Sequence, residues 1–192
     1  MSSKAKSLQL KGQLLVAMPG MLDPRFARSV ILICAHSEDG SMGFVLNQPV
    51  ASPKLSEILD ELDIEVDDPE AADKVMVFRG GPVEQGRGFV LHSQDYSTPA
   101  STRVEDLACV TATLDALRRL ASDNPPDRSI MLLGYAGWSA GQLEEEILQN
   151  GWLTTPATHE ILFETNHVRQ YEAALASLGI SEELLSAESG HA

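Results

Sequence analysis

The sequence has few residues of the types on which disulfide-rich, membrane-spanning or nucleic-acid-binding proteins depend. Two of its 192 residues are cysteine, too few for a disulfide framework in a chain of this length. Basic residues are also scarce, since 14 Lys and Arg stand against 28 Asp and Glu. Lys and Arg neutralise phosphates in nucleic-acid complexes, so the net charge of -14 argues against direct nucleic-acid binding. No apolar run approaches the ~20 residues of a transmembrane helix, and no secretion signal is visible, which predicts a cytoplasmic protein without a membrane segment.

The negative charge is unevenly distributed along the chain. Residues 51–80 carry nine acidic and three basic side chains, and residues 141–192 carry nine acidic and one basic. Residues 1–50 are mildly basic, with five basic and three acidic side chains. The terminal segments 1–10 and 186–192 are expected to be mobile.

Short apolar, β-branched runs predict most of the secondary structure. Strands are expected over residues 12–18, 30–35, 42–46, 75–78, 88–91, 107–110, 130–133 and 152–154. Helices are expected after the cap Ser52, over 113–121, after the cap Ser139 and over 167–178, with exposed polar segments over 63–73 and 93–103. Because two hairpins come first and strands do not alternate strictly with helices, the pattern predicts an α+β fold. No linker or repeat divides the chain, so residues 1–192 are expected to form a single domain.

Two of the helices are predicted from their capping residues. Ser52 precedes Pro53, which favours an N-cap followed by proline at the first helical position. Ser139 and Gln142 have the spacing of a capping box. Asn150-Gly151 provides the expected end of that second helix.

Four ordered segments of the sequence resemble the YqgE/AlgH family of bacterial proteins. They are GQLLVAMPGMLDPRFARSVILICAHSEDGSMGFVLNQPV from Gly12, FRGGPVEQGRGFVLH from Phe78, LLGYAGWSAGQLEEEILQNGWL from Leu132 and ILF from Ile161. The resemblance implies an α+β domain with a bent or bifurcated, mostly antiparallel, partly barrel-like sheet surrounded by helices. Some family members are regarded as transcriptional regulators of exopolysaccharide genes. The resemblance implies no catalytic residues, because no activity is established for the family.

The first candidate site is a loop rich in glycine and arginine. It runs from Arg79-Gly80-Gly81 to Arg87. Glycines let a backbone approach a ligand closely, and two guanidinium groups can hold a carboxylate or phosphate. The alternative interpretation is a wide hairpin connection in which the arginines pair with nearby acids.

The second candidate site is the segment Gly134–Gly141 with the start of the following helix. Gly137, Trp138, Ser139 and Gln142 are its candidate ligand-binding residues, because free N–H groups at a helix N-terminus favour an anion. The spacing matches neither the P-loop nor the dinucleotide fingerprint. The structural alternative makes Ser139 a cap and Trp138 an anchor packed on the sheet.

A third set of residues contains thiol and imidazole groups. Cys34 and His36 lie two apart on an expected strand, and His92 ends another. One Cys-x-His pair without a second spaced pair is a weak zinc signature, and catalysis by Cys34 would need a base within reach. The sequence therefore predicts no catalytic residue, no metal site and no cofactor. Asp23-Pro24 is interpreted as a turn.

Three hypotheses follow for the function. The first is a regulatory or adaptor protein that acts on a protein partner through protein contacts rather than by binding DNA. The second is a protein that binds a small molecule or nucleotide, with an enzyme as one form of this hypothesis. Its site would lie between the Arg79–Arg87 and Gly134–Gly141 loops. The third is a redox or metal function of Cys34.

Overall fold

The computed structural model describes residues 9–188, with side chains described as far as residue 185. A nine-stranded sheet forms its framework, in the order β6-β7-β5-β8-β3-β2-β1-β9, with β4 paired to β8 off this path. The strands are β1 (Gln13–Ala17), β2 (Val30–Ser37), β3 (Gly40–Val45), β4 (Val77–Arg79), β5 (Val83–His92), β6 (Thr102–Val104), β7 (Ala108–Thr111), β8 (Ser129–Ser139) and β9 (Trp152–Pro156). The helices are α1 (Leu55–Glu61), α2 (Pro69–Ala72), α3 (Leu114–Leu120), α4 (Gln142–Leu148), the π-helix η1 (Glu160–Glu164), α5 (Gln170–Ser177) and α6 (Glu182–Glu188).

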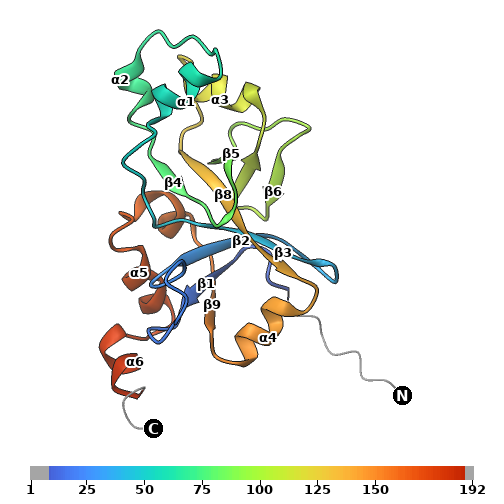
Figure 1. Ribbon diagram of the computed structural model, residues 1–192, viewed down its shortest axis with the longest axis vertical. Coiled ribbons are helices and arrows are strands. Elements are labelled where there is room, and N and C mark those ends of the chain that lie inside the picture. The colour runs from blue at the N-terminus through green and yellow to red at the C-terminus, as the bar shows by residue number, and fades with distance from the viewer. Residues whose placement is uncertain (1–8, 189–192) are drawn as a thin grey trace.

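Strand β8 joins the two halves of this sheet (Figure 1). Its first half pairs with β5 antiparallel and with β4 parallel, whereas Ala136–Ser139 pairs with β3. The register of β5 with β8 shifts between Val83 and Gly88, where an irregularity interrupts the ladder. The sheet therefore curls into a half-barrel that is antiparallel except at β4, and the expected α+β fold with a bifurcated sheet is confirmed.

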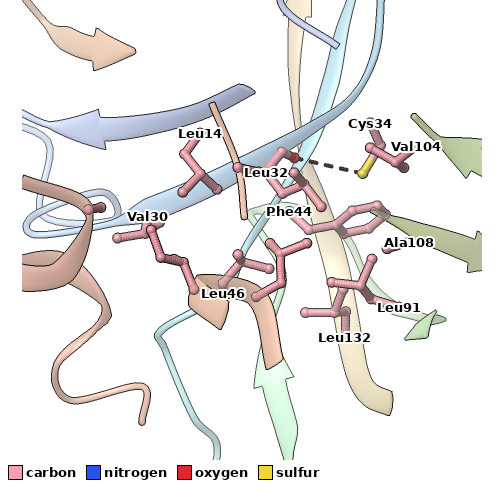
Figure 2. Close-up of a cluster of buried hydrophobic side chains, with 14 of the residues drawn as sticks. Leu14, Val30, Leu32, Cys34, Phe44, Leu46, Leu91, Val104, Ala108 and Leu132 are labelled. Atoms are coloured by element: carbon pink, nitrogen blue, oxygen red, sulfur yellow. Dashed lines mark hydrogen bonds between the residues drawn. The ribbon is translucent and has the colours of Figure 1, made fainter. Parts of the chain in front are cut away.

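Three apolar clusters form the core of the protein. The largest lies inside the curl, where Leu32, Phe44 and Leu91 are fully buried (Figure 2). A second cluster lies under α1 and α3, and a third connects α4 to β1, β2 and β3. Helix α5 packs on β1 and β2, and its Tyr171 hydroxyl donates a 2.7 Å hydrogen bond to the Ala17 carbonyl. Each half of the sheet thus has its own helical cover (Figure 1).

Both predicted serine caps are wrong. Helix α1 begins after Lys54, whose N–H donates to Glu57 Oε2 at 2.6 Å, so Glu57 satisfies the helix start that Ser52 was expected to cap. Helix α4 begins after Gly141, which has a φ of 74°. Ser139 instead ends β8 and pairs with Gly40, because the ladder to β3 continues past the expected end of the strand.

Three further elements differ from the prediction. The expected loop over 63–73 contains α2, capped by Asp68, and the polar segment 93–103 includes the first two residues of the edge strand β6. Residues 134–139 are strand rather than loop. Leu10 is buried, whereas the rest of the segments expected to be mobile lies mainly outside the described residues. Within residues 9–188, no helix is both long and apolar enough to cross a bilayer.

Candidate functional site

A cleft of about 410 Å³ is lined in part by residues of α4. Helix α4 and helices α1–α3 lie toward opposite ends of the molecule (Figure 1). We call this cleft the tryptophan cleft. Its principal lining residues are Asp23, Arg25, Phe26, Trp138, Glu146 and Trp152. They come from the loop before β2, the end of β8, α4 and the start of β9. The cleft therefore joins segments more than 100 residues apart in sequence, and no single motif contains it.

Backbone and amide contacts hold the loop over residues 18–29 at the rim of the cleft. Met18 N–H donates to the Gly151 carbonyl at 3.2 Å, which ties the loop to the turn before β9. Gln48 Nε2 donates to the Arg25 carbonyl at 3.0 Å, and Asn47 Nδ2 donates to the Arg28 carbonyl at 2.8 Å. The loop has no regular secondary structure, and these contacts instead satisfy one of its N–H groups and two of its carbonyl groups.

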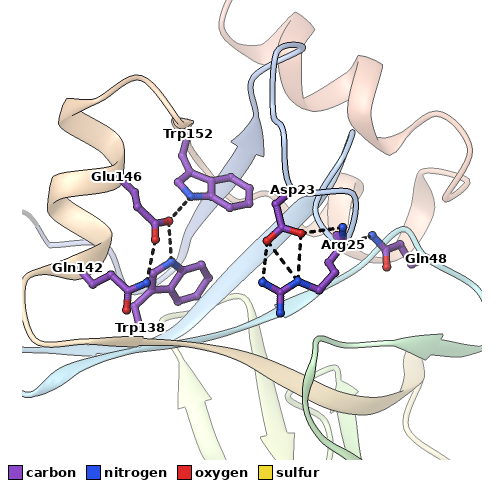
Figure 3. Close-up of polar contacts among 7 residues, drawn as sticks. All are labelled: Asp23, Arg25, Gln48, Trp138, Gln142, Glu146 and Trp152. Carbon is purple, nitrogen blue, oxygen red and sulfur yellow. Dashed lines mark hydrogen bonds and ion pairs between the residues drawn. The ribbon is translucent and has the colours of Figure 1, made fainter.

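The carboxylate of Glu146 is the centre of the polar contacts (Figure 3). Its Oε2 accepts the indole N–H of Trp138 at 3.0 Å and that of Trp152 at 2.8 Å. Its Oε1 accepts the amide of Gln142, one helical turn earlier, at 2.9 Å. Both indoles are buried, and an indole N–H is a donor that needs a partner, so Glu146 aligns the two rings.

A second carboxylate faces the cleft from the loop. Arg25 donates through Nε and Nη2 to both oxygens of Asp23, at 2.7 to 3.2 Å, and its backbone N–H adds a bond of 3.0 Å. These hydrogen bonds from Arg25 lower the pKa of Asp23, which is therefore ionised at neutral pH. The guanidinium is consequently occupied by Asp23 (Figure 3).

Glu146 has no cationic partner of this kind. Among the described residues, no Lys, Arg or His nitrogen lies within 4.0 Å of its carboxylate, and its three hydrogen bonds come from neutral donors. The cleft contains two carboxylates and one already paired guanidinium. Its floor is therefore acidic and partly apolar.

Three of the eight predicted site residues line this cleft: Gly137, Trp138 and Gln142. Ser139 lies beside it, where its N–H and hydroxyl donate to Gln142 Oε1 at 3.0 and 3.1 Å. Trp138 and Trp152 have two roles in the cleft. Each donates its indole N–H to Glu146, and the two rings pack edge to face with centroids 6.3 Å apart.

The other four predicted residues do not enter the cleft. Gly80 and Gly81 lie directly against the backbone of residues 134–136, so the two glycine segments meet, as packing rather than as a phosphate cradle. Arg79 is exposed at the end of β4. Arg87 lines two other hollows and lies 3.5 Å from Glu84. Arg87 shares one of these hollows with Tyr135 of the second glycine segment, whereas Arg79 lines none of the five hollows described here. A ligand site between the two predicted loops stays a prediction.

Sequence reasoning missed Asp23, Arg25, Glu146 and Trp152. Asp23 was interpreted as a turn residue, which it also is, since it accepts the N–H of Arg25 two residues later. Glu146 lies four residues after Gln142, so the predicted helix places both side chains on one face. That spacing was the one available signal, and it did not reveal which of three consecutive glutamates meets the tryptophans.

The thiol and imidazole groups do not form a common site. Cys34 is buried and donates weakly to the Leu32 carbonyl at 3.8 Å, whereas His36 Nδ1 contacts Ser41 Oγ at 2.8 Å and its Nε2 lies 3.5 Å from Glu144. His92 contacts the Ser93 carbonyl and Thr111 Oγ1. Over the described part of the chain, no three His, Cys, Asp or Glu side chains are placed to hold a metal ion.

The Cys34 thiol is expected to be unreactive in the folded protein. Burial raises its pKa to about 12, so almost no thiolate is present at pH 8. Treatment with iodoacetamide at pH 8 followed by mass spectrometry should find Cys34 unmodified in the native protein and modified in urea. Rapid alkylation of the native protein at Cys34 would contradict this and favour the redox hypothesis.

Burial of His92 predicts a loss of stability in mild acid. Its side chain is fully buried, and desolvation lowers its pKa. In the unfolded chain His92 takes up a proton near pH 6.5, whereas in the folded protein it does so only at lower pH. The free energy of unfolding therefore decreases as the pH is lowered below about 6.5, by up to ~1.4 kcal/mol per pH unit. Urea unfolding between pH 7.5 and 5.5 should show this slope. His92→Gln should flatten it, whereas His159→Gln, at an exposed position, should not.

Taken together, these features define an α+β protein with a half-barrel sheet and an acidic, tryptophan-lined cleft. The AlgH-like family model matches residues 14–183 of this chain. The chain belongs to this family, as its sequence segments predicted.

Relatives cover nearly the whole chain. A UPF0301 protein of Sinorhizobium medicae is 51% identical over 187 residues, covering 95% of this chain and 93% of its own. One of Methylocella silvestris is 52% identical over 189 residues, covering 95% and 92%. The solution structure of the AlgH protein from Pseudomonas aeruginosa is 38% identical, with a TM-score of 0.79 over all of both chains. A crystal structure of a Corynebacterium diphtheriae protein, 26% identical, has a TM-score of 0.70 and covers 92% of this chain.

Proposed function

We propose that this protein is a regulatory adaptor that acts through protein contacts, and that the tryptophan cleft receives an arginine or lysine side chain of its partner. The observation that carries the proposal is the Glu146 carboxylate, which has only neutral donors as partners among the described residues. A carboxylate has about four acceptor positions, of which three are used here. A cation from the partner would supply the missing counter-charge and the fourth hydrogen bond.

The walls of the cleft suit the stem of such a side chain. Met21, Phe26, Pro82 and Val83 line it beside the polar groups. Lys and Arg bury their aliphatic stems on surfaces of this kind while the charged head reaches a polar partner. The cleft thus matches a long cation better than a small inorganic ion.

Exposed leucines extend the apolar surface beyond the cleft. Leu22 lies between two lining residues and is 97% exposed, and Leu148, on α4, is 83% exposed. Large apolar side chains gathered near a hollow are typical of protein-binding surfaces. They support a partner that is a protein segment rather than a free amine.

The overall charge supports the same choice of partner. At a net charge of -14 the protein attracts basic surfaces over long range and repels nucleic acid. The proposal is therefore regulation through a basic protein partner, without direct DNA binding.

The two tryptophans allow a direct test, because they are the only ones in the chain and both lie in the cleft. We expect their indole ¹⁵N–¹H signals to shift on titration with an arginine-rich peptide, and not with a glutamate-rich peptide of equal length. Glu146→Gln removes the charge and should weaken the effect roughly tenfold or more, the usual value of a charge-assisted hydrogen bond.

Glu145→Gln is the matched control. It makes the same change on the same helix at an exposed position, where Glu145 accepts a hydrogen bond from Gln149. Should Glu146→Gln unfold the protein, Leu22→Arg adds a positive charge at the rim without touching the core and should weaken peptide binding. Indole shifts that are equal for basic and acidic peptides, or unchanged in these variants, would refute the proposal.

A further inference from the structure

A second hollow, of about 310 Å³, lies inside the curl of the half-barrel. We call it the aromatic pocket. Its principal lining residues are Phe44, Arg87, Phe89, Thr102, Val110 and Tyr135. They come from β3, β5, β6, β7 and β8, so both halves of the sheet contribute. The inner faces of curled sheets are frequent places for small ligands.

Three aromatic rings line this pocket. Phe89 lies between the other two, with its centroid 5.0 Å from that of Phe44 and 6.0 Å from that of Tyr135. Phe44 and Phe89 are buried, whereas Tyr135 is partly exposed. A flat ring of a ligand can therefore pack against ring faces and edges on several sides.

Arg87 brings the only charge among the lining residues. Its guanidinium lies over the Phe89 ring at 4.9 Å from the centroid, which positions it beside the aromatic wall. Over the part of the chain that the structure describes, its one ion pair is a 3.5 Å contact with Glu84 between two half-exposed side chains, a type that contributes little free energy. A guanidinium has five N–H donors, so most remain for a ligand.

The charge of this pocket differs from that of the rest of the protein. Four other hollows of similar size each have at least one Asp or Glu among their lining residues, and the aromatic pocket has none. Burial raises the pKa of Cys34, another lining residue, so its thiol is neutral at pH 7. An anion therefore meets no negatively charged side chain among the residues that line this pocket.

We propose that the aromatic pocket binds a small aromatic carboxylate, with the ring among Phe44, Phe89 and Tyr135 and the carboxylate on Arg87. A carboxylate matches the fork of a guanidinium with two parallel hydrogen bonds. The volume lies at the lower end of the range of small-molecule sites, which favours one or two rings over a nucleotide. This site is separate from the tryptophan cleft, and the inference does not depend on the proposed adaptor function.

The test uses 2-naphthoate and its neutral analogue 2-naphthamide as probes, followed by calorimetry and by NMR of the whole chain. We expect saturable binding of 2-naphthoate with a Kd below about 1 mM, and binding of the amide at least about tenfold weaker, because the amide lacks the charge. The backbone signals of Phe89, Thr102 and Tyr135 should shift. The indole signals of Trp138 and Trp152 should stay in place, which distinguishes this pocket from the cleft.

Arg87→Gln should weaken 2-naphthoate binding about tenfold or more, and Thr102→Phe, on the edge strand β6, should block the pocket. Arg118→Gln is the matched control, because Arg118 is 56% exposed and pairs with an acid three residues earlier, as Arg87 does at 54%. No saturable binding of 2-naphthoate, equal affinity for the amide, or equal losses in Arg87→Gln and Arg118→Gln would each overturn the proposal.

Discussion

Replacing Gly81 with alanine is expected to lower the free energy of unfolding by at least about 3 kcal/mol, or to prevent folding. A Cβ at this position would lie 2.1 Å from the Tyr135 carbonyl carbon and 2.4 Å from the Ala136 nitrogen. Both are backbone atoms of β8 and cannot turn aside as a side chain would. Overpacking of this kind commonly costs 1–3 kcal/mol, and here about the upper end or more because the strands themselves must separate.

The separation would also break hydrogen bonds of the neighbouring residue. Gly80 N–H donates to the Leu133 carbonyl, and its own carbonyl accepts the N–H of Val45, both at 2.8 Å. These bonds join β8 and β3 to the chain between β4 and β5. Their loss adds to the cost of the steric overlap, so a large effect is expected.

Urea unfolding of Gly81→Ala and Gly86→Ala provides the comparison. Gly86 lies in the same chain segment, but a Cβ there would meet no atom within 4 Å and its φ is outside the left-handed region. Gly86→Ala should be neutral or stabilising by up to about 1 kcal/mol. Similar stabilities of the two variants would show that the close approach of Gly81 to β8 does not determine the fold.

Replacing Trp152 with alanine is expected to cost about 3–5 kcal/mol, the usual loss for a large buried aromatic side chain. Trp152 is 3% exposed and packs edge to face on Phe26, with ring centroids 5.7 Å apart, as well as on Trp138. It also donates to Glu146. Its removal would therefore open the wall of the cleft and leave one oxygen of Glu146 with fewer donors.

The variant Trp152→Phe separates the two contributions. It keeps a ring for packing and removes the indole N–H, so about 1.5–3 kcal/mol should be lost, the usual value for a hydrogen bond to a charged group. Leu148→Ala, at a site 83% exposed on the adjacent helix, should change stability by less than about 0.5 kcal/mol. Chemical denaturation followed by circular dichroism measures all three, and a Trp152→Ala variant as stable as Leu148→Ala would contradict the packing assigned here.

The two proposed sites lie in different parts of the fold and can be tested separately. The tryptophan cleft lies beside α4, whereas the aromatic pocket lies inside the curl between β3 and β5. Strand β8 contributes Trp138 to the first and Tyr135 to the second, three residues apart. The separate readouts, indole signals for one and Arg87-dependent binding for the other, show whether either proposal fails alone.

Much of the local structure could be predicted from the sequence by itself. Continuous apolar runs predicted β1, β2 and β3, and Asn150-Gly151 predicted the end of α4, because burial and turn chemistry act over a few neighbouring residues. The family segments predicted the bifurcated half-barrel. Composition predicted the acidic character that underlies the choice of partner.

The tertiary structure alone decided how the polar side chains are used. Positions 80 and 81 require glycine because the backbone of β8 lies directly against them. Ser139 belongs to a strand because it pairs with Gly40 of β3. Glu146, among three consecutive glutamates, meets two indoles that arrive from β8 and β9. Such contacts depend on how distant segments cross in space, and the residue pattern of any one segment contains no information about that crossing.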